Sequence, residues 1–331
     1  MVCSRRLLLR CGTGRIAGYP HPSNGFVMSH PVAPSGRGIA FSLAASLLFA
    51  VLSGYTTLLR PLDGLAIFAW RMICTLPGVL LIVHLTRKRE ALAALLRRFV
   101  REPALWALVP LMAALNAVQL WVFLWAPLNG QTVAVSMGYF LTPLVMVLVG
   151  RVLYGERMYR LQCIAVALAL LGVLHELWLT RAIAWPTLLV VLGYPPYFVL
   201  RRLSKMEPVS GFALEMMMIF PVALLLLYQQ GETAWGVLAQ PLFWPLLAGL
   251  GLISSVALLL NITASHLLPM GLWGLLGYVE PALLFLLAIT FLGEPLSADR
   301  LLTYGPIWLA VLLTGVHTLR QQRKQSPGPA H

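Results

Sequence analysis

The sequence predicts an all-α integral membrane protein with ten transmembrane helices arranged as a 5 + 5 inverted repeat. Hydrophobic residues make up 59% of the 331 residues and charged residues only 11%. The mean hydropathy is +0.82, well outside the range of soluble domains. Two further observations support this fold: a stretch of the first half recurs in the second half, and basic residues gather in alternate connections between apolar runs.

Ten apolar runs supply the predicted spans. A hydrocarbon core about 30 Å thick is crossed by roughly 20 helical residues. The runs of suitable length are 38–59, 64–85, 104–126, 131–153, 161–179, 182–200, 211–229, 242–264, 268–292 and 301–319. They divide the chain into a cytoplasmic N-terminal tail (1–37), a first five-helix repeat (38–179), a second five-helix repeat (182–319) and a cytoplasmic C-terminal tail (320–331). The N-terminal tail is expected to be disordered, and a translation start at Met28 is left open.

Residues of the first half recur in the second half at a constant offset. Pro103, Trp106, Val118, Leu120, Ala126, Pro143, Leu148, Gly155 and Glu156 return as Pro241, Trp244, Val256, Leu258, Ala264, Pro281, Leu286, Gly293 and Glu294. The offset is the same at both ends of the stretch (241 − 103 = 138; 294 − 156 = 138). Because each half holds an odd number of spans, the two copies are expected to have opposite orientations. Alternating-access transporters use this architecture and bind substrate at mid-membrane between the halves.

The distribution of basic residues predicts the orientation. Of the 24 Lys and Arg residues, twenty lie in the connections on one side, three lie on the other side, and Arg71 lies within a span. This bias predicts both termini in the cytoplasm of a protein in the cell inner membrane. The loop 86–102 holds six basic residues and its counterpart 230–241 holds none, as expected for inverted copies. The net charge of +13 therefore reflects topology, and nucleic-acid binding is excluded.

Three charged side chains, Arg71, Glu215 and Glu280, lie about one helical turn or more inside predicted spans. A charge near the centre of the bilayer costs on the order of 2.5–3.5 kcal/mol on insertion scales, so each needs a partner or a water-filled cavity. Arg71 stays protonated at any ordinary pH and is expected to bind an anionic substrate group or to pair with Glu280. A structural ion pair or a place at the rim of the bundle is the alternative for Arg71.

Glu280 is the main candidate for proton coupling, because a low dielectric favours the neutral form of a carboxyl group. Pro281 follows it directly and removes a backbone hydrogen bond. A glutamic acid bonded to a neighbouring helix explains Glu280 equally well. Glu215 is a second candidate for proton coupling, since it occupies the place of Arg71 in the other repeat, six residues before a proline (77 − 71 = 6; 221 − 215 = 6). A bond from Glu215 to Arg201 or Arg202 is the alternative there.

Polar side chains in the predicted spans complete the expected substrate pathway. The candidates are Asn116, Gln119, Tyr139, Asn261 and Tyr278, together with predicted helix breaks at Pro143 and Pro281. Asn116 and Gln119 share a helix face through their i, i+3 spacing. Hydrogen bonding between helices is the alternative for these amides and tyrosines.

Signals of enzymatic activity are missing from the sequence. It contains no P-loop, no GxSxG, no HExxH and no aspartate pair at DxD spacing. The four cysteines show neither CxxC nor metal-ligand spacing. We therefore expect no enzyme, no cofactor and no metal site. The expected partners are a small-molecule substrate and membrane lipid, and a homodimer is left open.

The assembled motifs resemble the EamA-type drug/metabolite transporter superfamily, and within it the chloramphenicol-resistance permease (RarD-type) branch. The resemblance rests on Ser136-Met-Gly-Tyr-Phe-Leu-Thr-Pro143 with Gly155-Glu156, on Trp70-Arg71, and on Leu214-Glu215 with Phe220-Pro221. It implies ten helices in a 5 + 5 inverted arrangement and secondary transport of small molecules across the inner membrane. The chain departs from the usual pattern of the branch at Trp70, Ala134, Thr142 and Glu280.

The sequence thus predicts a secondary-active inner-membrane permease that exports or exchanges a small polar or amphipathic metabolite or drug by alternating access. Protons are the candidate coupling ion, with Arg71 orienting the substrate and Glu280 titrating. The alternatives are a membrane scaffold or decayed paralogue that does not transport and, less favoured, a membrane-embedded lipid-modifying enzyme. Substrate identity and direction of transport do not follow from the sequence.

Overall fold

Helices account for nearly all of the described chain, and no strand occurs in that part of it. The computed structural model describes residues 35–128, 131–156, 160–180, 185–280, 283, 302–303, 305–313 and 316. The helices are α1 (Gly36–Tyr55), α2 (Gly64–Leu85), α3 (Arg89–Arg101), α4 (Pro103–Leu128), α5 (Thr132–Tyr154), α6 (Arg160–Thr180), α7 (Trp185–Leu203), α8 (Pro208–Gln230), α9 (Glu232–Trp235), α10 (Phe243–Leu267) and α11 (Met270–Leu276), with 3₁₀ turns η1 (Thr56–Leu59) and η2 (Gly236–Ala239).

Seven helical segments in the described residues are long and apolar enough to cross a membrane. They are Gly36–Leu59, Gly64–Leu85, Pro103–Phe123, Met137–Tyr154, Arg160–Leu179, Pro208–Gln230 and Phe243–Leu267. Each falls on a predicted span, so seven of the predicted apolar runs form helices of membrane-crossing length. The span predicted at 182–200 corresponds to α7, whose three prolines and two terminal arginines make it less apolar. The spans predicted at 268–292 and 301–319 lie only partly in the described residues.

Two predicted connections are helical instead of loops. The stretch 86–102 contains α3, which buries Leu92 and Leu95 and exposes its arginines. The stretch 230–241 contains α9 and η2. The helix break predicted at Pro143 is wrong, because α5 runs through this proline from Thr132 to Tyr154. Pro281 lies outside the described residues, and the last described turn before it is at Gly277 and Tyr278.

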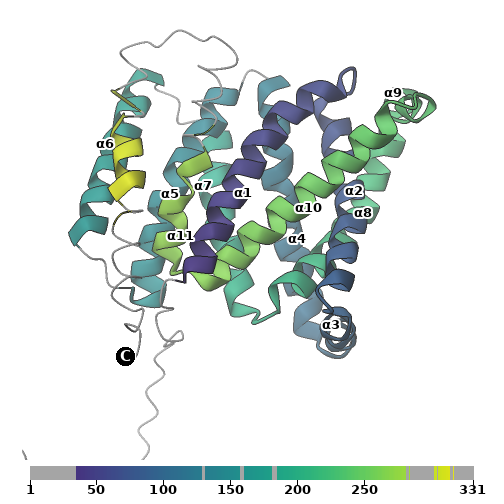
Figure 1. Cartoon of the computed structure of the whole chain (residues 1–331), viewed down its shortest axis with the longest axis horizontal. Helices are drawn as coiled ribbons and strands as arrows, with labels where there is room; N and C mark the ends of the chain where they lie inside the picture. The colour runs from purple at the N-terminus through teal and green to yellow at the C-terminus, as the bar shows by residue number, and fades with distance from the viewer. Residues whose placement is uncertain are drawn as a thin grey trace, which may run out of the picture.

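Helices that lie far apart in the sequence pack against one another. Helix α1 packs along α10, and the two cross the middle of the molecule side by side (Figure 1). Helix α2 packs against α8 and α10, α5 packs against α7 and α11, and α4 packs against α7 and α8. Helix α6 lies at one edge of the bundle, while α3 and α9 lie at opposite ends of it (Figure 1). Since α3 follows α2 and α9 follows α8, the packed helices α2 and α8 run in opposite directions.

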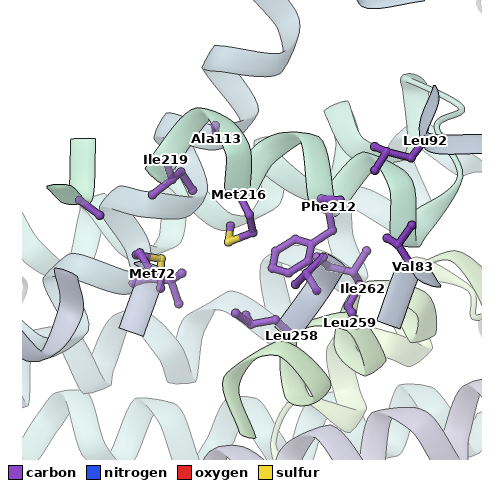
Figure 2. Packing of buried hydrophobic residues seen from close by; sticks show 14 of the residues in the cluster. Met72, Val83, Leu92, Ala113, Phe212, Met216, Ile219, Leu258, Leu259 and Ile262 are labelled. Atoms are coloured by element: carbon purple, nitrogen blue, oxygen red, sulfur yellow. The ribbon is translucent and has the colours of Figure 1, made fainter. Parts of the chain in front are cut away.

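The largest apolar cluster forms where α2, α4, α8 and α10 meet (Figure 2). Met72 and Val83 of α2 face Phe212 and Met216 of α8, and Leu258 of α10 closes the cluster. All five side chains are at most 5% exposed. Burying side chains of this size stabilises the bundle by roughly 1.5–3 kcal/mol each relative to water, and less relative to lipid. This cluster holds in place the helix that carries Arg71.

Candidate functional site

Arg71 is buried at the contact between α2 and α10. Asp63 begins α2 by accepting a 2.7 Å hydrogen bond from the Ala66 backbone N–H, a standard N-cap. Two turns later the Arg71 side chain is 4% exposed, and its Nε donates to Ser254 Oγ at 3.1 Å. This is the only side-chain hydrogen bond of Arg71 within the described part of the chain. A guanidinium group has five N–H donors, so its two terminal nitrogens remain available to a ligand.

Glu280, Tyr139 and Tyr194 surround the guanidinium group. All three lie within electrostatic range of Arg71. The rings of Tyr139 and Tyr194 are neighbours, with centroids 5.8 Å apart. Among the described residues no ion pair within 4.0 Å joins Arg71 to Glu280. The two charges are therefore close enough to interact without forming a direct ion pair.

Two buried amides on α4 lie next to the tyrosine pair. Gln119 is 1% exposed, and its Nε2 donates to the Leu189 carbonyl of α7 at 3.0 Å. The Tyr139 hydroxyl reaches the Gln119 backbone carbonyl at 3.4 Å. Gln119 Oε1 and Asn116 Nδ2 are buried and have no hydrogen-bond partner among the residues that the structure describes. Buried polar atoms are rarely left without a partner, so one free acceptor and one free donor on the same helix face suit a polar ligand.

Two predicted pathway residues, Tyr278 and Asn261, have no hydrogen bond to this group within the described residues. Tyr278 is fully buried, and its hydroxyl donates to the Phe140 carbonyl at 2.8 Å. It thus makes the hydrogen bond between helices that the sequence left open as the alternative. Asn261 is partly exposed on α10, seven residues beyond Ser254 and hence about 10 Å further along the same helix face.

Glu215 lies in a buried ion pair of its own. It is fully buried in α8, contacts the Arg201 guanidinium directly, and accepts a 2.9 Å hydrogen bond from the Tyr197 hydroxyl. Arg201 also donates to the Pro208 carbonyl at 2.5 Å. These contacts tie the end of α7 to the start of α8. The bond to Arg201, which the sequence offered as an alternative, is present, and no electrostatic link joins Glu215 to Arg71.

Sequence reasoning missed Tyr194 and Ser254. Tyr194 stands directly before Pro195 and Pro196, so a tyrosine just before prolines within a span was the available signal. Ser254 offers no such signal, because a serine in an apolar helix most often bonds to its own backbone. Its contact with Arg71 joins residues 183 positions apart.

Comparisons with known proteins assign the chain to a family. No family model matches it. A protein of Pseudomonas aeruginosa named "Chloramphenicol-sensitive protein RarD" is 53% identical over 292 residues, which cover 88% of this chain and 98% of that protein. An "Uncharacterized transporter" of Haemophilus influenzae is 40% identical over 85% of this chain and 93% of that protein. "Protein RarD" of Escherichia coli is 28% identical over 88% of this chain and 97% of that protein.

A solved crystal structure shares the fold. It aligns with a TM-score of 0.60 at 18% sequence identity and covers 86% of this chain and 98% of the other. The helical, apolar structure fits the names of the relatives, which point to a non-enzymatic membrane protein of the transporter type. At 53% identity over nearly its whole length to a RarD protein, the chain belongs to the RarD family of multi-pass, transporter-type membrane proteins.

Proposed function

We propose that the protein is a secondary-active permease of the cell inner membrane that exports or exchanges a small polar or amphipathic molecule by alternating access. The observation that carries this proposal is a buried Arg71 whose terminal nitrogens have no partner among the described residues and which faces Glu280, Tyr139 and Tyr194. A buried charge is costly in a membrane protein unless it serves a ligand, a cavity or an ion pair. Relatives named as transporters favour the ligand.

A 5 + 5 inverted repeat is part of the proposal, and equivalent contacts in the two halves support it. Trp106 and Trp244 (244 − 106 = 138) both donate from Nε1 to a carbonyl of the preceding segment, at 2.6 Å and 3.0 Å. Asp63 and Glu207 (207 − 63 = 144) cap α2 and α8 through 2.7 Å hydrogen bonds. The antiparallel packing of α2 and α8 agrees with inversion, since Lys88 beyond the end of α2 lies 3.7 Å from Glu207 at the start of α8.

The charge of the two ends supports an orientation with both termini in the cytoplasm. The end that carries α3 presents exposed Arg89, Arg97 and Arg101. The opposite end, with α9, contains Glu232 and no basic residue between 230 and 241. Basic residues remain on the cytoplasmic side during membrane insertion, so we place the α3 end in the cytoplasm.

In this proposal Arg71 and Glu280 divide the work of binding and coupling. The terminal guanidinium nitrogens of Arg71, which have no partner in the described part of the chain, form a planar fork that suits a carboxylate or another anionic group of the substrate. Glu280 can hold a proton in one orientation of the carrier and release it in the other, because the environment of a carboxyl decides whether it is charged. Gln119 Oε1 and Asn116 Nδ2 add one acceptor and one donor for polar groups of the substrate.

The test is flux into proteoliposomes with an imposed pH gradient, using a panel of small anionic, zwitterionic and neutral metabolites. Chloramphenicol joins the panel because the Pseudomonas relative is named for sensitivity to it. We expect at least one compound to be transported by the native protein and not by Arg71→Ala. Normal insertion and purification of Arg71→Ala is the necessary control. A native protein that moves none of the panel, and whose thermal stability no compound changes, would favour the non-transporting scaffold.

A further inference from the structure

Four helices are fastened together at one end of the bundle by Glu156 and Arg202, which the site described above does not include. Glu156 follows α5 directly, after Gly155 in the left-handed conformation (φ 61). Its two carboxylate oxygens accept hydrogen bonds from the backbone N–H groups of Met270 at 2.6 Å and Gly271 at 2.9 Å. Both oxygens thus cap the first turn of α11, where a negative charge also meets the positive end of the helix dipole.

Arg202, near the end of α7, makes the second half of the fastening. Its Nη2 donates to the Ser265 carbonyl at 2.8 Å and to the Leu268 carbonyl at 2.6 Å. Ser265 lies in the last turn of α10 and Leu268 directly follows the helix, where no further turn supplies N–H donors. Nη1 lies 3.8 Å from Glu156, and the guanidinium carbon lies 4.7 Å from the centre of the Tyr154 ring, within range of a cation–π contact.

The Glu156–Arg202 clamp therefore joins α5, α7, α10 and α11 at the end that we place in the cytoplasm. It is largely buried but touches water, with side-chain exposures of 11% for Glu156 and 13% for Arg202, whereas those of Glu215 and Arg201 are 0% and 1%. Water can therefore replace its hydrogen bonds at lower cost than those of that fully buried pair. Behind it, α5 and α11 touch through glycines: a methyl group on Gly274 would lie 2.7 Å from Met146 Cβ and 3.1 Å from the Pro143 carbonyl. A close, smooth contact of this kind can separate without disentangling long side chains.

The arginine half of the clamp has no counterpart in the other half of the chain. The equivalent of Arg202 under the offset that relates Asp63 to Glu207 is Leu58 (202 − 144 = 58), an exposed apolar residue. The arginine of this fastening is thus not repeated under that offset, which lets the two orientations of the proposed duplicated carrier differ in free energy.

We propose that the Glu156–Arg202 clamp is the cytoplasmic gate of the carrier: it holds this end closed, and its opening is the step that exposes the central site to the cytoplasm. This inference rests on the proposed function and on the orientation given there. Glu156 and Arg202 act as positioning residues, since neither is among the groups around Arg71. Closure is set by the charge-assisted bonds of the clamp, so removing either charge shifts the equilibrium toward the open form.

The test measures access to a position behind the clamp and needs no substrate. Val147 is 7% exposed. Its Cα would lie 3.5 Å from a methyl group added to Gly271, so it sits at the contact between α5 and α11. Val147→Cys, in a protein whose four native cysteines are replaced, would be labelled in inside-out vesicles with a membrane-impermeant thiol reagent. We expect Glu156→Gln and Arg202→Gln each to raise the labelling rate at least tenfold. Glu102→Gln is the matched control, because Glu102 pairs with Arg98 within one exposed segment at the same end.

Labelling rates of both clamp variants equal to that of Glu102→Gln would overturn the proposal. If Glu156→Gln fails to fold because α11 loses its cap, Arg202→Gln decides alone, since it leaves both bonds from Glu156 to α11 in place. Arg202→Lys is a second variant to measure. A single ammonium group keeps the charge but cannot reproduce the planar geometry with which the guanidinium bonds two carbonyls. The labelling rate of Arg202→Lys should therefore lie between those of the native protein and Arg202→Gln. Failure of the proposed function would appear as absent flux with the labelling differences intact.

Discussion

Tyr278 and Phe140 occupy equivalent positions of the two halves of the chain (278 − 140 = 138), and they are bonded to each other. The Tyr278 hydroxyl donates to the Phe140 carbonyl at 2.8 Å, and Tyr278 is fully buried. Equivalent positions of two copies come into contact only where the copies meet on their common axis. In the proposed inverted repeat, the contact between α5 and the turn after α11 is therefore the place expected for an axis relating the halves.

Tyr278→Phe should lower the stability of the protein without changing the site around Arg71. Loss of one hydrogen bond costs about 0.5–1.5 kcal/mol, and the ring remains to fill its space. Thermal unfolding in a mild detergent measures the effect. Tyr228→Phe is the control, because Tyr228 is 78% exposed and removing its hydroxyl should leave the unfolding temperature unchanged. Equal unfolding temperatures for the two variants would show that the buried hydroxyl contributes nothing.

Glu215 should prove to be required for stability rather than for coupling. Removing one partner of a buried ion pair leaves an uncompensated charge and costs about 3–5 kcal/mol, so Glu215→Ala should strongly destabilise the protein by leaving Arg201 unpaired. The double variant Arg201→Met/Glu215→Leu should recover most of that loss, since apolar residues of similar volume often replace such pairs without penalty. Unfolding curves of the two variants provide the comparison. A stable double variant that transports but has lost its dependence on a pH gradient would instead assign coupling to Glu215.

Hydropathy predicted the spans well because a helix in lipid must satisfy its backbone internally and face apolar surroundings, and both constraints are local. The helix α3 was missed for a related reason. Leu92, Leu95 and Leu96 follow helical spacing, but with charged residues between them the stretch is no apolar run of 20 residues. A search for apolar runs alone passes over a helix whose other face is exposed.

The candidate site was predicted only in part, because its contacts join distant positions. The sequence placed Arg71 and Glu280 in the membrane and offered their interaction, and the structure puts them within electrostatic range. Ser254, which binds Arg71, could not be found without knowing that α2 packs on α10. The same holds for Glu215: its pairing with Arg201 depends on how α7 turns into α8, which hydropathy does not determine.

Gly193→Ala should disturb the amide site on α4. A methyl group at position 193 would overlap the Gln119 side-chain nitrogen and push it away from the Leu189 carbonyl. Overpacking of this kind typically costs about 1–3 kcal/mol. Gly54→Ala is the matched control, since nothing lies within 4 Å of a methyl group there. The combination Gly193→Ala/Gln119→Ala should regain stability because the clash is removed; a double variant no more stable than Gly193→Ala would contradict the contact.

Glu280→Gln should abolish the dependence of transport on a pH gradient while leaving binding at Arg71 intact. Glutamine keeps the size and hydrogen-bonding capacity of the protonated acid but can neither release nor take up a proton. In proteoliposomes, native flux should respond to an imposed gradient, whereas flux of Glu280→Gln should be the same with and without it. Counterflow, in which labelled substrate exchanges for unlabelled substrate without net proton movement, should persist in the variant. Gradient-driven flux that survives in Glu280→Gln would remove Glu280 from the coupling mechanism, and loss of both flux and counterflow would make it a binding or structural residue.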